Sequence, residues 1–120
     1  MRQVGVITKQ IIDSLSLDIE ENTPIFISEN NERHVKERHP YEYEYYYPYV
    51  EEILATPDYV RRNMKHNSID YIKAFQFGND YVQASVRVDA SGTLFVRTVF
   101  QVMSYKMERY IKNGFLVKIN

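Results

Sequence analysis

The chain has 120 residues, with 15 basic and 16 acidic side chains for a net charge of −1, no cysteine and eleven tyrosines. Its length predicts a single domain over residues 1–120, and its apolar fraction of 44% with only four glycines and four prolines excludes a disordered or fibrous protein. The lack of cysteine excludes disulfide frameworks and thiol nucleophiles, and the lack of a long apolar run or signal-peptide pattern predicts a cytoplasmic protein without a membrane span.

The first half of the chain shows mainly helical periodicity. A short amphipathic helix is predicted by four apolar residues at i, i+4, i+5 and i+8, namely Ile7, Ile11, Ile12 and Leu15. A short buried strand is expected at residues 25–27, followed by a helix at residues 30–39 that Pro40 ends. Another helix with an apolar face is expected at residues 49–54. Residues 56–58 have the N-cap and first-turn pattern of one more helical turn.

From residue 69 onward the hydrophobic period changes from helical spacing to two. Three runs rich in β-branched and aromatic residues predict strands at 69–77, 81–88 and 93–102. Turn-forming residues at 78–80 and 89–92 separate them, which predicts an antiparallel meander.

The C-terminal residues return to helical spacing. A helix is expected from Met103 to Ile111 with Ser104 as its cap, Gly114 is expected to end it, and residues 115–119 are expected to add an edge strand. Helices first and an antiparallel sheet afterwards predict an α+β fold, in which N-terminal helices pack on a small antiparallel sheet and a C-terminal helix follows.

The charges are distributed unevenly along the chain. Residues 1–60 carry 12 acidic and 5 basic side chains for a net charge of −7, whereas residues 61–120 carry 4 acidic and 10 basic side chains for +6. A basic half is typical of a surface that binds polyanions. The alternative interpretation, favoured by charge alone, is that the two halves pack together and mix their charges on one surface.

The hairpin of residues 81–102 predicts a polar group on one sheet face. If its loop has an even number of residues, Gln83 faces Thr98 and shares a face with Ser85 and Arg87. An amide, hydroxyls and a guanidinium together can hold a phosphate. The alternatives are a polar, solvent-exposed face without such a role, or an odd-length loop that breaks the grouping.

The segment His34–Pro40 holds the residues with the most distinctive chemistry. On a helix, His34 and Arg38 lie one turn apart on the same stripe, so a proton-transferring imidazole lies beside a phosphate-binding guanidinium. Metal binding is not expected, because His34 and His39 are separated by five positions and the sequence has no HExxH motif. The equally weighted alternative is that His39 caps the helix and His34 is simply solvated.

The order of these features resembles a known nuclease superfamily. A strand at 25–27 leads into a helix ending in His34-x-x-x-Arg38-His39-Pro40, and a helix then ends at residues 56–60. Lys73 lies in the first strand of the meander and Val96-Arg97-Thr98-Val99-Phe100 in its last. This arrangement resembles the phage-associated branch of the barnase, EndoU, colicin E5/D and RelE-like (BECR-fold) nucleases.

The resemblance covers about residues 25–112 and implies a metal-independent, toxin-like ribonuclease of phage or prophage type that needs no cofactor. It implies that His34 or His39 deprotonates a ribose 2′-hydroxyl, that Lys73 neutralises the phosphate and that Thr98 donates a hydrogen bond to a phosphate oxygen. Further contacts to RNA are expected from Arg38, Arg87, Arg97 and Lys106. Barnase-like enzymes use a glutamate base, whereas no single glutamate stands out on the sheet of this chain.

Residues 41–49 contain six of the eleven tyrosines. Tyrosine buries a large ring and still presents a hydroxyl, so such a run is typical of a protein interface. The alternative, slightly favoured, is that alternate rings cover the core between two helices. The sequence thus predicts an endoribonuclease that acts through the 2′-hydroxyl of RNA. The other hypothesis is a non-catalytic phage-associated binding or structural protein, which holds a partner or inhibitor through Tyr41–Tyr49.

Overall fold

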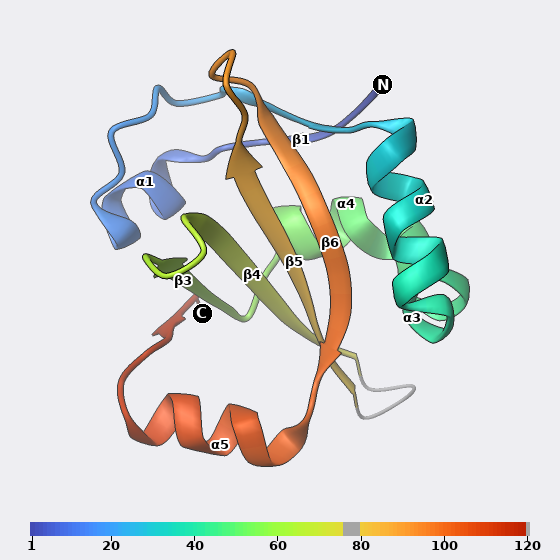
Figure 1. The fold of residues 1–120 in the computed structure, drawn as a ribbon. Helices are drawn as coiled ribbons and strands as arrows, with labels where there is room; N and C mark the ends of the chain where they lie inside the picture. Colours follow the sequence, from blue (N-terminus) through green and yellow to red (C-terminus); the bar gives the residue numbers. More distant parts are fainter. Residues whose placement is uncertain (76–79, 120) are drawn as a thin grey trace.

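The computed structural model of the protein describes residues 1–75 and 80–119. These residues form one seven-stranded sheet with helices around it (Figure 1). In chain order, the elements are β1 (Arg2–Val6), α1 (Lys9–Leu15), β2 (Pro24–Ile27), α2 (Glu29–Arg38), α3 (Pro40–Tyr45), the 3-10 helix η1 (Tyr47–Tyr49), α4 (Val50–Ala55), β3 (Tyr59–Asn63), β4 (Ser68–Phe75), β5 (Asp80–Val88), β6 (Leu94–Val102), α5 (Ser104–Lys112) and β7 (Val117–Lys118).

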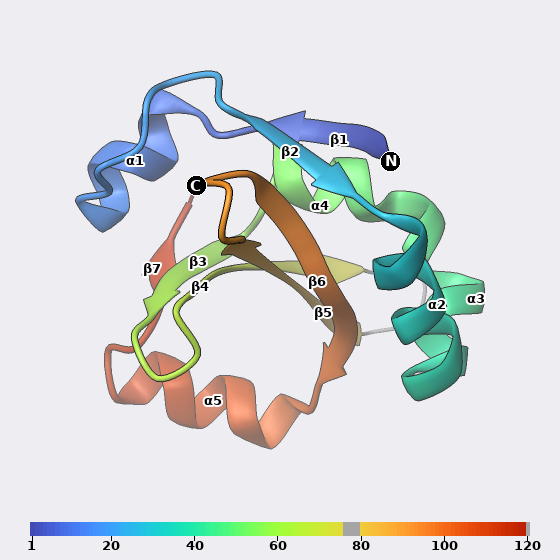
Figure 2. The same cartoon turned by 45° about the horizontal axis from the view of Figure 1, so that its top comes forward.

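The strand order in the sheet is β1-β2-β6-β5-β4-β3-β7. The predicted meander of β4, β5 and β6 forms its centre, and every pairing is antiparallel except that of β2 with β6. The α+β class and the C-terminal helix are therefore confirmed. The sheet is larger than predicted and mixed, because β2 joins the edge of the meander in parallel before the chain enters α2 (Figure 2).

Helices cover both faces of the sheet. The main core lies on one face, where strand residues pack against Ile11 of α1, Val35 of α2 and Ile53 of α4. A smaller core lies on the opposite face, where Met107 of α5 packs against Ile72 and Val102. The first face therefore carries the predicted N-terminal helices, and α5 closes the other (Figure 2).

Most predicted elements are confirmed with small shifts in their ends. The predicted helical turn at residues 56–58 is wrong. The Asp58 backbone N–H donates to the Ile72 carbonyl on β4, and the chain enters β3 at the next residue. Pro40 does separate two helices, but it occupies the first turn of α3, where its missing N–H costs nothing. The N-cap of α5 is Met103 and not Ser104. The predicted turn at Gly78-Asn79 and the end of the first predicted strand lie outside the described residues.

The β5–β6 hairpin differs in register from the even-loop prediction. Val88 pairs with Leu94, so the loop contains an odd number of residues, and Thr98 pairs with Ser85 instead of Gln83. A β-bulge at Arg97 adds one residue to β6, which reverses its side-chain parity. The polar group of Gln83, Ser85, Arg87 and Thr98 consequently shares one sheet face despite the odd loop. None of the helices within residues 1–75 and 80–119 is long and apolar enough to cross a membrane.

Candidate active site

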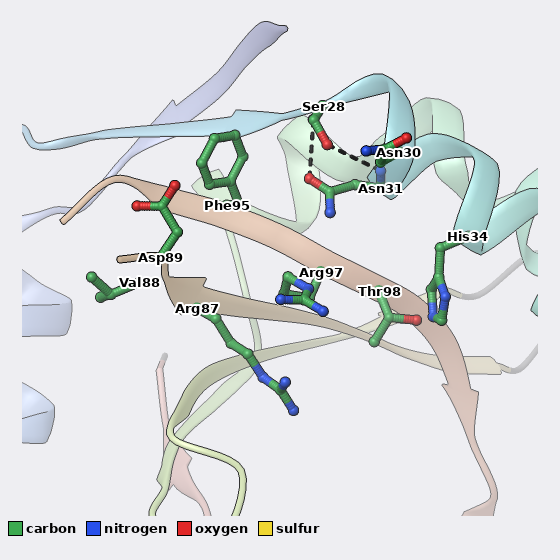
Figure 3. Close-up of a pocket in the computed structure, with 10 residues that line it drawn as sticks. All are labelled: Ser28, Asn30, Asn31, His34, Arg87, Val88, Asp89, Phe95, Arg97 and Thr98. Atoms are coloured by element: carbon green, nitrogen blue, oxygen red, sulfur yellow. Dashed lines mark hydrogen bonds between the residues drawn. The ribbon is translucent and has the colours of Figure 1, made fainter. Parts of the chain in front are cut away.

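A cavity of about 520 Å³ lies between the first turns of α2 and the β5–β6 hairpin. Figure 3 shows its lining side chains, which come from the helix on one side and from the two strands on the other. Four residues singled out in the sequence line it together, namely His34, Arg87, Arg97 and Thr98. The fold thus brings the helix histidine to the polar sheet face.

The position of His34 follows from how α2 begins. The Ser28 hydroxyl accepts a hydrogen bond from the Asn31 backbone N–H, and the Asn31 side chain accepts one from the Ser28 N–H, forming a capping box. Because β2 ends at Ile27 beside β6, the helix starts at the cavity and presents the positive end of its dipole there. His34 follows in the second turn with an exposed side chain.

Two polar atoms in this cavity are buried without a hydrogen-bond partner among the described residues. They are Arg87 Nε and Thr98 Oγ1. An unpaired buried donor has a free-energy cost of about 1–3 kcal/mol, which a ligand that accepts a hydrogen bond would remove. An N–H, a hydroxyl and the exposed guanidinium of Arg97 are donors that suit a phosphate.

His39 lies next to this cavity. Its ring centroid is 6.2 Å from that of His34 and 5.7 Å from that of Phe100. The His39 backbone N–H donates to the Val35 carbonyl, so His39 is the C-cap residue of α2, as the alternative interpretation expected. Its imidazole is half-buried and remains beside His34.

The structure does not bring the other three predicted residues to the cavity. The Lys73 ammonium donates to the carbonyl and the hydroxyl of Thr56, and Lys73 pairs with Val82 on the sheet face opposite Arg87. Arg38 is exposed in the last turn of α2, and Lys106 is exposed on α5. Neither of these two side chains lines the cavity.

The comparison with protein families identifies the family of the chain. A family model described as phage-Barnase-EndoU-ColicinE5/D-RelE like nuclease3 matches residues 2–109. The chain belongs to this family of BECR-like nucleases. No curated protein and no solved structure matches it.

The family match extends further toward the N-terminus than the predicted resemblance over residues 25–112. It includes β1, which pairs with β2 and so supports the strand that leads into the histidine helix. A nuclease family implies a nucleic-acid substrate. Across residues 1–75 and 80–119, no three His, Asp or Glu side chains gather in a way that would hold a metal ion.

Sequence reasoning missed the rest of the cavity of this nuclease-family domain. Phe95 and Asp89 line it beside the four predicted residues, and Asn31 faces it from α2 (Figure 3). The capping spacing of Ser28 and Asn31 and the turn composition of residues 89–92 were visible in the sequence. Neither feature indicated a ligand, because both patterns also occur wherever a helix starts or a hairpin turns.

Proposed function

We propose that this BECR-like nuclease is a metal-independent endoribonuclease that cleaves RNA through the ribose 2′-hydroxyl. The observation that carries the proposal is the presence of His34, Arg87, Arg97 and Thr98 around one cavity. This set supplies a proton acceptor, two cations and a hydroxyl donor, and the neighbouring His39 would supply the acid that such a cleavage also requires.

In the proposed reaction, His34 takes the proton from the 2′-hydroxyl, and the 2′-oxygen forms a bond to phosphorus. The bond from phosphorus to the 5′-oxygen of the next nucleotide breaks, and that oxygen takes a proton from the His39 imidazolium. The products are a 2′,3′-cyclic phosphate and a free 5′-hydroxyl. The separation of 6.2 Å between the two imidazole centroids supports placing both histidines at one phosphate.

The two arginines would stabilise the negative charge that develops on the phosphate oxygens during the reaction. Arg87 and Arg97 would bind the non-bridging oxygens, and the Thr98 hydroxyl would donate a hydrogen bond to one of them. The buried, unpaired state of Arg87 Nε and Thr98 Oγ1 supports this assignment, because a phosphate oxygen would supply the acceptor that both donors lack. Lys73 is not included, since its ammonium binds Thr56.

The test is cleavage of single-stranded RNA by the purified protein with and without EDTA. We expect cleavage to persist in EDTA and to leave 2′,3′-cyclic phosphate ends, because the nucleophile is the internal 2′-oxygen. An oligonucleotide of the same sequence made only of deoxyribose should stay intact. Loss of cleavage on chelation, with recovery on adding a divalent ion, would contradict the metal-independent mechanism.

Binding should depend on salt in a way that identifies the contacting cations. Each arginine that contacts a phosphate of single-stranded RNA contributes about 0.7 to the slope of log affinity against log salt concentration. Arg87→Gln and Arg97→Gln should each lower that slope, measured by fluorescence anisotropy. Lys9→Gln is the control, because Lys9 lies on α1 and binds Asp13 instead. Equal slopes for all three variants would mean that the cavity does not hold the phosphate.

A second candidate function rests on the tyrosine-rich segment. Tyr46 and Tyr47 are buried in the core, whereas Tyr41, Tyr45 and Tyr49 are 47%, 51% and 43% exposed. The segment therefore both covers the core and presents an aromatic surface. If the wild-type protein cleaves no RNA, a non-catalytic protein that binds a partner through these exposed rings becomes the better hypothesis.

A further inference from the structure

The cavity has a second end that the proposed cleavage does not use. Phe95 and Asp89 line this end, and Figure 3 shows both of them away from His34 and Thr98. Phe95 pairs with Arg87 and Thr98 pairs with Ser85, so with the bulge at Arg97 the two positions lie two β5 residues apart, about 7 Å at the usual rise of a strand. A base, its ribose and its 3′-phosphate fit along such a span.

The Phe95 ring is held in place and still lines the cavity. It packs against Phe26 on the neighbouring strand β2, with ring centroids 6.2 Å apart and an interplanar angle of 47°. The ring is half-buried, so part of it stays accessible, and it is the one aromatic ring of carbon atoms among the described residues that line the cavity. An aromatic ring in this situation offers a stacking surface to a nucleobase.

Asp89 keeps one carboxylate oxygen available. Its Oδ1 accepts hydrogen bonds from the Ser91 N–H, the Ser91 hydroxyl and the Thr93 N–H, at 2.9, 2.6 and 3.0 Å. These bonds, above all that from the Ser91 hydroxyl, lower the pKa of Asp89, so the group is ionised at neutral pH. No hydrogen bond from the described residues reaches Oδ2. An anion here repels a phosphate and favours a ligand with N–H donors.

We propose that Phe95 and Asp89 form a nucleobase subsite that selects a base carrying an exocyclic amino group, cytosine in preference to uracil. The base stacks on Phe95, and its amino group donates to Asp89 Oδ2, while the 3′-phosphate of the same nucleotide lies at Arg87 and Thr98. This inference rests on the proposed function for the phosphate end of the cavity.

Cytosine and uracil make the sharpest comparison, because they have the same size and stack alike. Cytosine presents an N4 amino donor where uracil presents the O4 acceptor. A carboxylate oxygen attracts the donor and repels the acceptor. One charge-assisted hydrogen bond corresponds to a preference of about 10- to 100-fold for cytosine.

The test uses two oligodeoxynucleotides that differ only in one residue, a single ribocytidine or a single ribouridine, so that one linkage in each can be cleaved. The wild-type protein should cleave after cytidine about 10- to 100-fold faster than after uridine. In Asp89→Asn, the side-chain oxygen can still accept the turn hydrogen bonds, while an N–H2 donor replaces Oδ2. This variant should therefore lose or reverse the preference. Asp13→Asn, an exposed carboxylate on α1, is the matched control and should keep it.

The outcomes separate this inference from the proposed function. Equal cleavage of both substrates by the wild type, or an unchanged preference in Asp89→Asn, overturns the subsite and leaves the ribonuclease proposal standing. If the wild type cleaves neither substrate, the proposed reaction fails. The subsite is then tested by comparing the affinities of the protein for cytidine 3′-monophosphate and uridine 3′-monophosphate. Tighter binding of the cytidine nucleotide, with NMR shifts of the Asp89 and Phe95 amides, would support it. Equal binding or none would overturn it.

Discussion

Replacing His34 with glutamine is expected to slow RNA cleavage by about 10²- to 10⁴-fold, the range typical of a lost general base. Glutamine keeps much of the size and hydrogen-bonding capacity of histidine but has no nitrogen that takes up a proton near neutral pH. The His34 side chain is exposed and contributes little to the core, so the melting temperature should stay nearly constant. Single-turnover cleavage and thermal unfolding, measured on the same preparation, test both halves of this expectation.

Two control variants separate chemistry from folding. His66→Gln makes the same change at an exposed position in the β3–β4 turn and should cleave RNA at the wild-type rate. Val35→Ala removes two methyl groups from the buried neighbour of His34, so it should lower the melting temperature without a specific chemical defect. If His34→Gln cleaves RNA as fast as the wild type, the assignment of His34 as the base is wrong.

The predicted elements were most accurate where hydrophobic periodicity was strong. The central strands β5 and β6 and the start of β4 have a clear period of two, and the structure places them close to their predicted positions. By contrast, neither β1 nor β3 was predicted, and residues 56–58 just before β3 were assigned to a helical turn. Both strands are short and lie outside the central meander, where pairing with a neighbour decides the conformation more than local composition does.

Part of the candidate site was predictable, because side chains alternate between the two faces along a strand. Alternation along a strand shows which residues share a face, so Arg87 and Ser85 could be grouped from the sequence alone. The face of Lys73 could not be decided, because it depends on the register between β4 and β5. That register pairs Lys73 with Val82 and so directs it to the opposite face. The bulge at Arg97, which returns Thr98 to the cavity, also left no sequence pattern that distinguishes it from a regular strand.

The largest effect on stability is expected at Asp70, on the sheet face that also carries Arg87. The Asp70 side chain is fully buried and accepts hydrogen bonds from Arg61 Nε at 2.8 Å, Asn63 Nδ2 at 3.2 Å and Ser68 Oγ at 2.8 Å. The Arg61 guanidinium also lies 4.8 Å from the centre of the Tyr110 ring, which links α5 to the ion pair. The charge of Asp70 thus compensates a cation that is itself only 18% exposed.

Asp70→Asn should lower the free energy of unfolding by about 3–5 kcal/mol, because it leaves the buried Arg61 cation without its counterion. The matched control is Asp13→Asn, which breaks the exposed Lys9–Asp13 pair and should shift the urea midpoint very little. A further variant, Arg61→Met with Asp70→Asn, removes the unpaired charge and should recover part of the lost stability if charge imbalance is the cause. If Asp70→Asn unfolds at the same urea concentration as Asp13→Asn, the buried ion pair does not stabilise this sheet face. If the double variant is no more stable than Asp70→Asn, the loss comes from the hydrogen bonds of Asn63 and Ser68 instead.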